Sequence, residues 1–320
     1  MGCLIANVIS NDKRIVASST PNVASLSPVV RATAGLSTPE INVAPSMTDG
    51  RASLEVSGVS VKPVQISMVC DAVINSISIE KYLTIRALED GLTASLASDN
   101  VFYCIDGSGD WIELSAGTKT PAINTGQTLS FKANYTSYNT SRRFSITKKC
   151  DVLGDPMSLY YGSKASKYDT MPYNYSFAYL FYRVTTIVDA SELKLDRKLK
   201  QYAYYYMFQG CTALITPPEL PQTTLQNSCY RRMFQGCTAM TTAPVLPALV
   251  LKNNCYEYML TSCNKFRELT MLATDISASN CLLGWVNAVR SSGTFYKNKD
   301  ATWTTTGASG VPSGWTVVLV

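Results

Sequence analysis

Carboxylates and cysteines are the side chains of this 320-residue sequence that could carry out chemistry, because the sequence contains no histidine. The absence of histidine excludes Ser-His-Asp and Cys-His nucleophilic catalysis and zinc sites with histidine ligands. Glycoside hydrolysis needs only two carboxylates, so composition leaves this reaction open. The acidic residues of the C-terminal half share no repeated position that would set two of them across a cleft: Glu219, Glu257, Glu268 and Asp275. We therefore predict that the protein is not an enzyme and uses no cofactor.

One glycine-rich segment offers oxygen ligands for a metal ion. The segment Asp106-Gly107-Ser108-Gly109-Asp110 could form a calcium loop, since alternating oxygens in such a turn suit this hard cation. It lacks the glutamate that calcium loops carry at their twelfth position. Asp-Gly next to alternating residues is also a common hairpin signal. We predict a hairpin turn here and no metal site.

Six of the ten cysteines alternate at intervals of 18 and 8 residues: Cys211, Cys229, Cys237, Cys255, Cys263 and Cys281. A metal or disulfide framework is one interpretation, but the spacing offers no pair separated by two to four residues. The cysteine content is also below that of disulfide-dense proteins. Free cysteine is among the most buried residue types. We predict that these six cysteines are reduced and buried.

Basic residues gather most closely between positions 194 and 200, as Lys194, Arg197, Lys198 and Lys200. Leucines alternate with them, as on an ordinary amphipathic strand or helix, so we predict a solvated face and no nucleic-acid partner. The net charge of +5 is modest for this length. No stretch reaches the roughly 18 apolar residues of a membrane helix, and we predict no membrane insertion.

The C-terminal half repeats itself with a period of 26 residues. The segment Gln209-Gly210-Cys211-Thr212-Ala213 returns as Gln235-Gly236-Cys237-Thr238-Ala239. A third copy that begins near Tyr256 is more divergent, and residues 175–200 form a degenerate first copy. Repeats of this length predict a stack in which equivalent apolar residues lie over one another.

Within one unit, three apolar residues recur at i, i+4 and i+8, the spacing of one helical face: Leu225, Cys229 and Met233. Thr224 offers an N-cap oxygen, and Gly236 would end the helix. Met240-Thr241-Thr242 can form a short strand, which Pro244 would end. We therefore predict one helix and one strand in each unit.

The motif from Cys229 to Pro247 reads Cys-Tyr-x-x-Met-Phe-x-Gly-Cys-Thr-x-Met-Thr-x-Ala-Pro-x-Leu-Pro. It resembles the BspA-type leucine-rich repeat, found on surface proteins of gut bacteria and of the phages that infect them. The closing segment, from Met271 to Val317, is similar to that family's C-terminal cap. The resemblance covers about residues 155–320 and implies an adhesion scaffold without known catalytic residues. The sequence departs from the motif at Arg231-Arg232.

The N-terminal half has a different pattern. Apolar and polar residues alternate from Leu83 to Ala87 and from Leu129 to Tyr135, as in half-buried strands. Serine, threonine, proline and alanine dominate up to about Pro45, and the part before residue 40 is typical of a segment that orders on a partner. Strands are predicted from Ala52 to Val61 and from Val64 to Ile74. The predicted fold class is multidomain: an N-terminal β arm (1–77), an antiparallel β-sandwich (78–154), and an α/β leucine-rich-repeat solenoid with a C-terminal cap (155–320).

This organisation predicts an attachment protein. The N-terminus lacks the basic and apolar regions of a secretory signal, so we expect a phage virion structural protein, a fibre or appendage subunit on the head or tail. Residues 1–77 would dock on capsid or tail proteins and mediate homo-oligomerisation, and the repeats would bind a host surface protein or glycan. The alternative is a bacterial cell-surface adhesin.

Tyrosines and arginines of the repeats are the candidate binding residues. The tyrosines between positions 202 and 206 cannot all point inward from one turn, and exposed tyrosine is a favoured binding anchor. Tyr204 recurs as Tyr230 and is assigned to the core. Residues that differ between copies are better surface candidates, and we predict partner binding by four of them: Tyr202, Tyr205, Arg231 and Arg232.

Overall fold

The computed structural model of the chain describes residues 81–320 in full and, before them, the backbone of six strands. The chain divides into two compact units, residues 1–76 and 77–320. The described strands of the first unit form two antiparallel sheets, ordered β1-β6-β3 and β2-β5-β4. Their bounds are β1 Leu4–Asn7, β2 Arg14–Ala17, β3 Val29–Ala32, β4 Asn42–Thr48, β5 Arg51–Ser57 and β6 Gln65–Val69. The remainder of the predicted docking arm lies outside the described residues.

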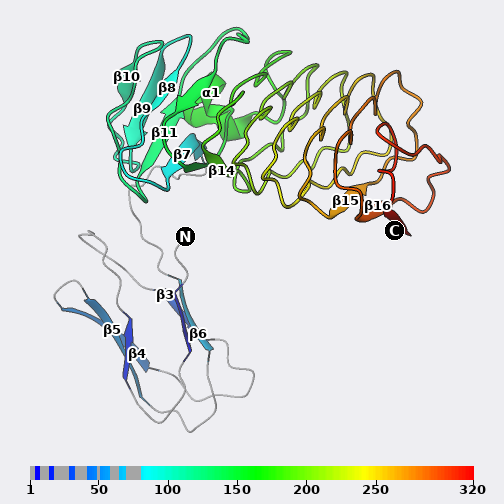
Figure 1. Ribbon diagram of the computed structural model, residues 1–320. Coiled ribbons are helices and arrows are strands. Elements are labelled where there is room, and N and C mark those ends of the chain that lie inside the picture. The colour runs from blue at the N-terminus through cyan, green and yellow to red at the C-terminus, as the bar shows by residue number, and fades with distance from the viewer. Residues whose placement is uncertain are drawn as a thin grey trace. The chain divides into compact units, whose positions relative to one another are not determined.

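The second unit begins with a six-stranded sheet in the order β10-β9-β11-β7-β13-β14, beside the β8-β12 pair (Figure 1). The bounds are β7 Leu83–Ala87, β8 Ala94–Leu96, β9 Val101–Ile105, β10 Ile112–Leu114, β11 Thr128–Lys132, β12 Phe144–Ile146, β13 Cys150–Leu153 and β14 Ile187–Asp189. Neighbouring strands run antiparallel except β13 and β14, which are parallel. The rings of Phe131 and Phe144 pack edge to face at 5.0 Å and join the two sheets in one core.

Within residues 81–320 there is one α-helix, α1 (Ser158–Tyr161), which continues as the 3-10 helix η2 (Gly162–Lys167). The hydroxyl of Ser158 accepts from the amide of Leu83 and donates to the carbonyl of Phe131, both at 2.9 Å. This buried side chain therefore fixes α1 against strands β7 and β11. Gly162, with a φ of 51°, ends the helix after one turn.

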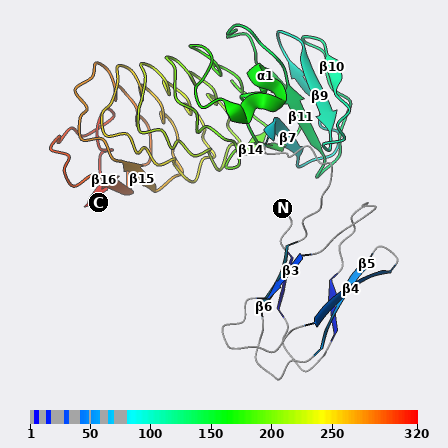
Figure 2. The same cartoon turned by 180° about the vertical axis from the view of Figure 1, so that it is seen from behind.

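Residues 175–288 form the repeat stack, a row of successive coils that Figures 1 and 2 show side by side. One segment of each coil has the same conformation, in which the first, fifth and ninth residues have a positive φ. We call these the turn segments. They are residues 175–183, 202–210, 228–236, 254–262 and 280–288. After the first, the turn segments follow the 26-residue period of the sequence.

Backbone hydrogen bonds of the turn segments alternate between two kinds of partner. The amide of Tyr204 donates to the carbonyl of Cys229 in the next coil at 2.9 Å, and other odd-numbered positions of each segment do likewise. The amides at even-numbered positions donate to the carbonyl three residues earlier in the same coil, as the amide of Met207 does to the carbonyl of Tyr204 at 3.1 Å. Within residues 175–288, five bonds of the first kind join each pair of adjacent turn segments. The backbone is thereby satisfied without a helix or a continuous strand.

The helix predicted in each repeat is wrong. The i, i+4, i+8 spacing arises from a turn that repeats every four residues, whereas an α-helix has 3.6 residues per turn and a φ near −63°. A positive φ at every fourth residue is incompatible with that geometry. Buried residues follow the same period in pairs, as Ala203 with Tyr204 and Met207 with Phe208.

The predicted fold class is corrected accordingly. Residues 81–320 hold short strands, turn segments and one four-residue helix, so the α/β leucine-rich-repeat solenoid predicted for residues 155–320 is not observed. The antiparallel β-sandwich predicted for residues 78–154 is not observed either. Its larger sheet is open and is extended by the parallel strand β14 from the following segment.

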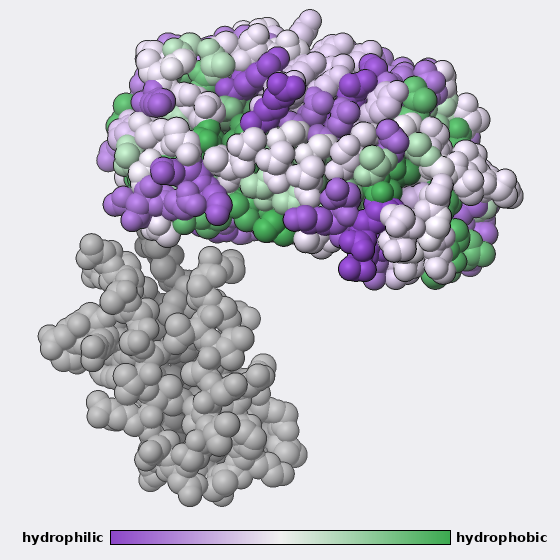
Figure 3. Space-filling model, viewed as in Figure 1, coloured by the Kyte–Doolittle hydropathy of each residue, from purple (hydrophilic) through white to green (hydrophobic). Residues whose placement is uncertain are grey.

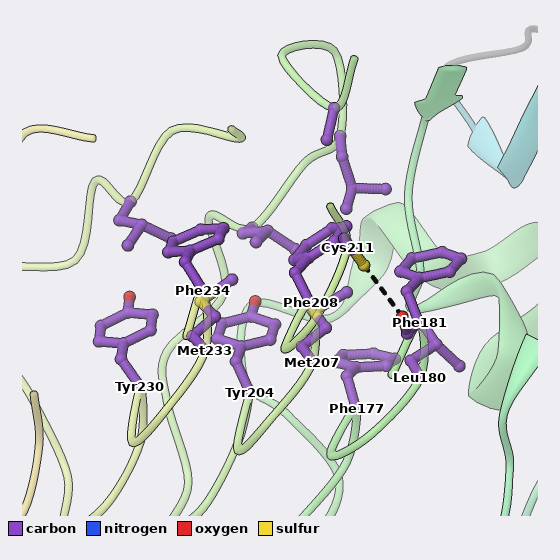
Figure 4. Packing of buried hydrophobic residues seen from close by; sticks show 14 of the residues in the cluster. Phe177, Leu180, Phe181, Tyr204, Met207, Phe208, Cys211, Tyr230, Met233 and Phe234 are labelled. Atoms are coloured by element: carbon purple, nitrogen blue, oxygen red, sulfur yellow. Dashed lines mark hydrogen bonds between the residues drawn. The ribbon is translucent and has the colours of Figure 1, made fainter. Parts of the chain in front are cut away.

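Aromatic columns fill the interior of the repeat stack (Figure 4). Tyr204, Tyr230 and Tyr256 stack with centroid distances of 5.7 and 6.0 Å. A second column runs through Phe181, Phe208 and Phe234 with distances of 5.3 and 5.8 Å. Figure 4 shows the two columns in parallel rows with methionines between them. The middle rings, Tyr230 and Phe208, are covered on both sides by the equivalent rings of the neighbouring coils.

The six repeat cysteines form two further columns and are all buried and free. The thiol of Cys211 donates to the carbonyl of Phe181 in the preceding coil at 3.1 Å, and the equivalent thiols of Cys237 and Cys263 make the same contact. Because donation needs a protonated thiol, this packing depends on the reduced form. The prediction of reduced, buried cysteines agrees with this arrangement.

The stack ends in a three-stranded parallel sheet of β15 (Glu268–Met271), β16 (Thr294–Lys297) and β17 (Thr316–Leu319). Two tryptophans fasten this end by donating from the indole nitrogen to backbone carbonyls. Trp285 bonds to Gly310 at 2.9 Å, and Trp315 bonds to Arg290 at 2.8 Å. No helix in the described part of the chain is long and apolar enough to cross a membrane.

Candidate functional site: a tyrosine and arginine face

The four-residue period of the turn segments decides which side chains point outward. Positions two, three, six and seven are buried for the most part, and positions one, four, five, eight and nine form the outer side. In the first four segments these outer positions carry tyrosines and arginines. Together with two residues from the preceding loop they make up the Tyr–Arg face: Tyr138, Arg143, Tyr175, Tyr179, Tyr182, Arg183, Tyr202, Tyr205, Tyr206, Arg231, Arg232 and Tyr258.

The first column of the face occupies position one. The rings of Tyr175 and Tyr202 stack at 4.3 Å with an angle of 3° between their planes. Tyr138, which is 52% exposed, extends this column at 5.5 Å from Tyr175. Later coils carry Ser228 and Asn254 at the same position, so the column of rings ends after the second coil.

A second column occupies position five and combines rings with a guanidinium. Tyr179 stacks on Tyr206 at 4.9 Å. The guanidinium of Arg232 then lies between two rings, 5.5 Å from Tyr206 and 4.6 Å from Tyr258. Stacking on aromatic rings covers the flat sides of a guanidinium and leaves its in-plane N–H groups for other partners.

Tyr205 connects the two columns from position four. Its ring meets Tyr202 edge to face at 5.6 Å and Tyr206 at 4.2 Å. Arg231 lies 5.7 Å from the same ring and forms a 2.7 Å salt bridge with Glu257. The carboxylate of Glu257 is nearly buried and also accepts from the side-chain amide of Asn254.

The face carries more positive than negative charge. Among the residues that the structure describes, Arg231 is the only one of the four arginines of the face that forms a salt bridge. Arg143 instead lies over Tyr179 and Tyr182, and Arg183 lies over Tyr182. The Nε atoms of Arg231 and Arg232 are buried without a hydrogen-bond partner. These guanidinium groups therefore retain unused donors.

Four tyrosine hydroxyls of the face have a raised pKa and remain protonated at neutral pH. Partial burial of the ring raises the pKa of Tyr206 to about 12, with the neighbouring Tyr205 as a further cause. Burial likewise raises the pKa of Tyr175, Tyr179 and Tyr205 above the usual 10.0. Each phenol can therefore donate a hydrogen bond as well as accept one.

Seven of these residues adopt a backbone conformation that their side chains disfavour. The φ values of Tyr175, Tyr179, Tyr202 and Tyr206 lie between 56° and 63°, and Arg183, Arg232 and Tyr258 also have a positive φ. Bulky residues rarely take this left-handed conformation, which costs about 1–2 kcal/mol. Other coils place Asn280 or Gly284 at equivalent positions. The fold does not require aromatic residues there.

All four residues predicted from the sequence to bind a partner lie on this face, and Tyr204 and Tyr230 are buried in the core. Sequence reasoning missed the rest of the Tyr–Arg face. Tyr175 and Tyr179 belong to the degenerate first repeat, whose register is shifted by one residue. Tyr138 and Arg143 come from a loop of the sheet region that no repeat pattern could reveal. The strict period of four was the available signal for Tyr206 and Tyr258.

The predicted turn at residues 106–110 is present. The carboxylate of Asp106 accepts from the amide of Thr128 and the side-chain amide of Gln127, both at 2.7 Å. Asp106 and Gly107 have φ values of 49° and 64°, as in a tight hairpin. No group of three or more metal-ligating side chains occurs in the part of the chain that the structure describes.

The basic segment from position 194 to 200 is largely paired. Arg197 bonds to Asp155 and Asp196, both at 2.6 Å, and Lys198 bonds to Asp169 at 2.6 Å. The leucines between them are buried. Lys198 and Lys200 are exposed, as predicted for a solvated face, whereas Arg197 is largely buried against Asp155.

A shallow open groove lies beside this segment, lined by residues 191–196 together with Glu219 and Pro221. Two of its carboxylates are already engaged, since Glu192 pairs with Arg86 at 3.0 Å and Asp196 pairs with Arg197. The other acidic residues considered from the sequence lie on separate elements: Glu257 on a turn segment, Glu268 on β15 and Asp275 beyond it. The groove does not present the free carboxylate pair of a glycosidase.

Comparisons of the sequence with protein-family models and with curated proteins, and of the fold with solved structures, find no match.

Proposed function

We propose that this chain is a non-enzymatic phage virion protein, a fibre or appendage subunit, that displays the repeat stack for adhesion to the host surface. The observation that supports this proposal most is the Tyr–Arg face. Twelve aromatic and guanidinium side chains lie together on one side of a regular backbone, and tyrosine and arginine are the residues most enriched at binding hot spots.

The rigidity of the support favours a binding role over a structural one for the face. Its side chains project from turn segments whose backbone is tied to the next coil by five hydrogen bonds. Stacked rings such as Tyr175 and Tyr202 hold each other in place before any ligand arrives. A preorganised surface loses little conformational entropy on binding, which favours affinity.

The surrounding surface offers no broad apolar alternative on the side seen in Figure 3. There, hydrophobic residues are scattered in small groups among hydrophilic ones. Such scattered residues are normal for a protein surface and do not mark a docking site. Adhesion through aromatic edges and guanidinium groups is the mode that these side chains support.

The division of the chain into two compact units suits an appendage, because one unit can dock while the other binds. In this proposal residues 1–77 attach to capsid or tail proteins and support homo-oligomerisation, and several copies of the Tyr–Arg face add their weak contacts. The alternative is a bacterial cell-surface adhesin of the BspA type, to which the repeat motif bears an equal resemblance.

Mass spectrometry of purified virions and of host envelope fractions separates the two. We expect peptides of this chain in virions banded on a density gradient, at a level comparable to other structural proteins. Recovery from the envelope fraction of uninfected bacteria, and not from virions, would replace the virion proposal with the adhesin.

Adhesion itself is tested with the full-length protein on host cells. Removal of two tyrosine rings, Tyr202→Ala with Tyr205→Ala, should reduce cell binding about tenfold or more, as expected for hot-spot residues. Tyr168→Ala is the matched control, because this tyrosine is 41% exposed and stacks on Tyr161, outside the face. Equal binding by both variants would contradict a role for the face in adhesion.

A further inference from the structure

We infer that the Tyr–Arg face binds an acidic polysaccharide, with the carboxylate or sulfate groups of the polymer on the guanidinium groups of the face. This inference rests on the proposed adhesive function and specifies its ligand. It starts from the unused donors of the face. Arg143, Arg183 and Arg232 have no carboxylate partner among the described residues, and each stacks on at least one ring.

Guanidinium groups without a carboxylate partner point to an anion. Arg183 is exposed, and Arg143 and Arg232 are partly exposed, so their positive charge is open to a ligand. The Nε atoms of Arg231 and Arg232 are buried without a hydrogen-bond partner, so a ligand would contact the exposed parts of these side chains. Guanidinium groups whose flat sides rest on aromatic rings present their N–H groups in one plane, which matches the oxygens of a carboxylate or sulfate.

The arrangement of the rings argues for sugars over nucleic acid. Single-stranded nucleic acids bind by stacking bases on open aromatic faces. Here the flat sides of Tyr175 and Tyr202 cover each other at 4.3 Å and 3°, and Tyr179 and Tyr206 do the same at 4.9 Å and 13°. Ring edges and hydroxyls are what remains. Phenol hydroxyls donate and accept, and so match the hydroxyls of a sugar.

The spread of the donors over the stack argues for an extended anionic polymer. Arg183 is at position nine of the first turn segment, and Arg231 and Arg232 are at positions four and five of the third. The hydrogen bonds between coils hold these two groups of donors in a fixed relation. A ligand that repeats along its own length can engage both coils at once, and its weak contacts then add. An acidic polysaccharide lying along the stack meets this requirement and supplies hydroxyls between its charges.

The test measures binding of the full-length protein to immobilised polysaccharides of known charge. Polygalacturonate serves as the carboxylated probe, heparin as the sulfated probe and dextran as the neutral one. We expect at least one acidic probe to bind, to weaken as salt increases, and to exceed dextran at least tenfold. The acidic probe that binds more tightly shows whether the face prefers carboxylate or sulfate groups. Equal binding of dextran, or no binding of either acidic probe, overturns the inference.

Two variants localise the binding. R183Q with R232Q should weaken the acidic probe about tenfold or more, which corresponds to about 1.4 kcal/mol. The matched control is K265Q with R267Q, which removes two exposed positive charges outside the face and should bind as the wild type does. An equal loss in both pairs would show that net charge alone causes binding and would overturn the assignment to this face.

A second pair guards against misfolding. Tyr205→Phe with Tyr206→Phe keeps both rings and removes their hydroxyls, and we expect the affinity for the acidic probe to fall threefold to tenfold with an unchanged melting temperature.

Tighter binding of a single-stranded oligonucleotide or of polyglutamate than of either polysaccharide would replace the sugar with that polymer. If the polysaccharide binds but the protein is absent from virions, the proposed function fails alone. If the face mediates cell attachment but binds no acidic probe, only the present inference fails.

Discussion

The six-stranded sheet and the repeat stack satisfy their backbones in different ways. In β11, amides and carbonyls pair with two neighbouring strands, β7 and β9, as in any antiparallel sheet. In a turn segment, every second amide bonds within its own coil and the others bond to the next coil. Strand β11 is buried without a break from Thr128 to Phe131, whereas the turn buries pairs of residues at intervals of four.

The difference affects which side chains are free to vary. In the repeat stack each inner position faces its own equivalent in the next coil, so like residues stack, as Tyr204 does on Tyr230. The outer positions have no such partner in the core, and they change from Tyr202 to Ser228 to Asn254 along one column. We therefore expect the inner columns to determine stability and, in the proposed function, the outer columns to determine recognition. Four predictions test this expectation.

The largest expected effect is loss of stability at alkaline pH, since six of the eight described free cysteines lie in the stack. Burial raises the pKa of Cys229 and Cys263 to about 12, from the usual 9.0. The folded thiols therefore hold their protons more tightly than unfolded ones. Their contribution is complete below pH 9 and is lost as the pH rises towards 12, by about 1.4 kcal/mol per thiol and pH unit.

Urea unfolding between pH 8 and pH 10.5 measures this dependence. In a variant with Cys229 and Cys263 replaced by alanine, the free energy of unfolding should fall less steeply with pH, because two of the titrating thiols are gone. The same slope in the variant and the wild type would mean that these thiols ionise as readily in the folded state as in the unfolded one.

The next largest effect concerns the aromatic column. Phe208→Ala removes a fully buried ring between Phe181 and Phe234 and should cost about 3–5 kcal/mol in the free energy of unfolding. Phe131→Ala removes an equally buried ring from the sheet and should cost a similar amount. Phe102, 38% exposed on β9, is the control, and its removal should cost less than about 1 kcal/mol.

Hydrogen exchange should then separate the two buried variants. A stack transmits a defect mainly to its neighbours, so Phe208→Ala should speed exchange in the adjacent coils more than in β7 and β11. Uniformly faster exchange across residues 81–320 would show instead that sheet and stack unfold as one block.

A smaller effect comes from the glycine at the end of a turn segment. Gly236 has a φ of +78°, and a Cβ there would meet only the backbone of Gly210 at 3.8 Å, an ordinary contact. Gly236→Ala should therefore destabilise the protein by about 1–2 kcal/mol through its backbone conformation alone. Thermal unfolding measures this loss, and an unchanged or higher melting temperature would contradict a left-handed conformation at position nine.

The smallest effect is expected in the outer column. Tyr202→Asn introduces the residue type of Asn254 and Asn280, which tolerates a positive φ better than tyrosine does. The lower cost of the positive φ offsets the lost stacking on Tyr175. The free energy of unfolding should therefore change by less than about 1 kcal/mol, while cell binding falls. A larger loss of stability in denaturant unfolding would assign Tyr202 to the structural residues of the stack.

The strands of the sheet and the length of the repeat could be predicted from the sequence. Alternation from Leu83 to Ala87 coincides with β7, and the 26-residue period coincides with the step between coils. The conformation within each coil could not be inferred from three apolar residues spaced by four, because helix and turn share that spacing over two turns. Adjacent buried pairs such as Met207 and Phe208 hold the strict period of four over longer stretches, which a helix cannot.

The candidate site was predictable in part. Tyr202, Tyr205, Arg231 and Arg232 were found because they differ between otherwise similar copies. Tyr138 was beyond reach, since its stacking on Tyr175 joins a loop of the sheet region to the first coil. Contacts between unlike regions leave no periodic trace in a sequence.

The hydrogen bonds between coils also determine how the stack carries a mechanical load. A force that pulls the two ends of the stack apart acts along these bonds, and all the backbone bonds between two adjacent coils share it in parallel. Once an interface breaks, its coil is released whole, and 26 residues can extend by at most about 90 Å. Under force the stack would therefore lengthen in discrete steps, one coil at a time. Each step relieves the tension on the interfaces that are still intact.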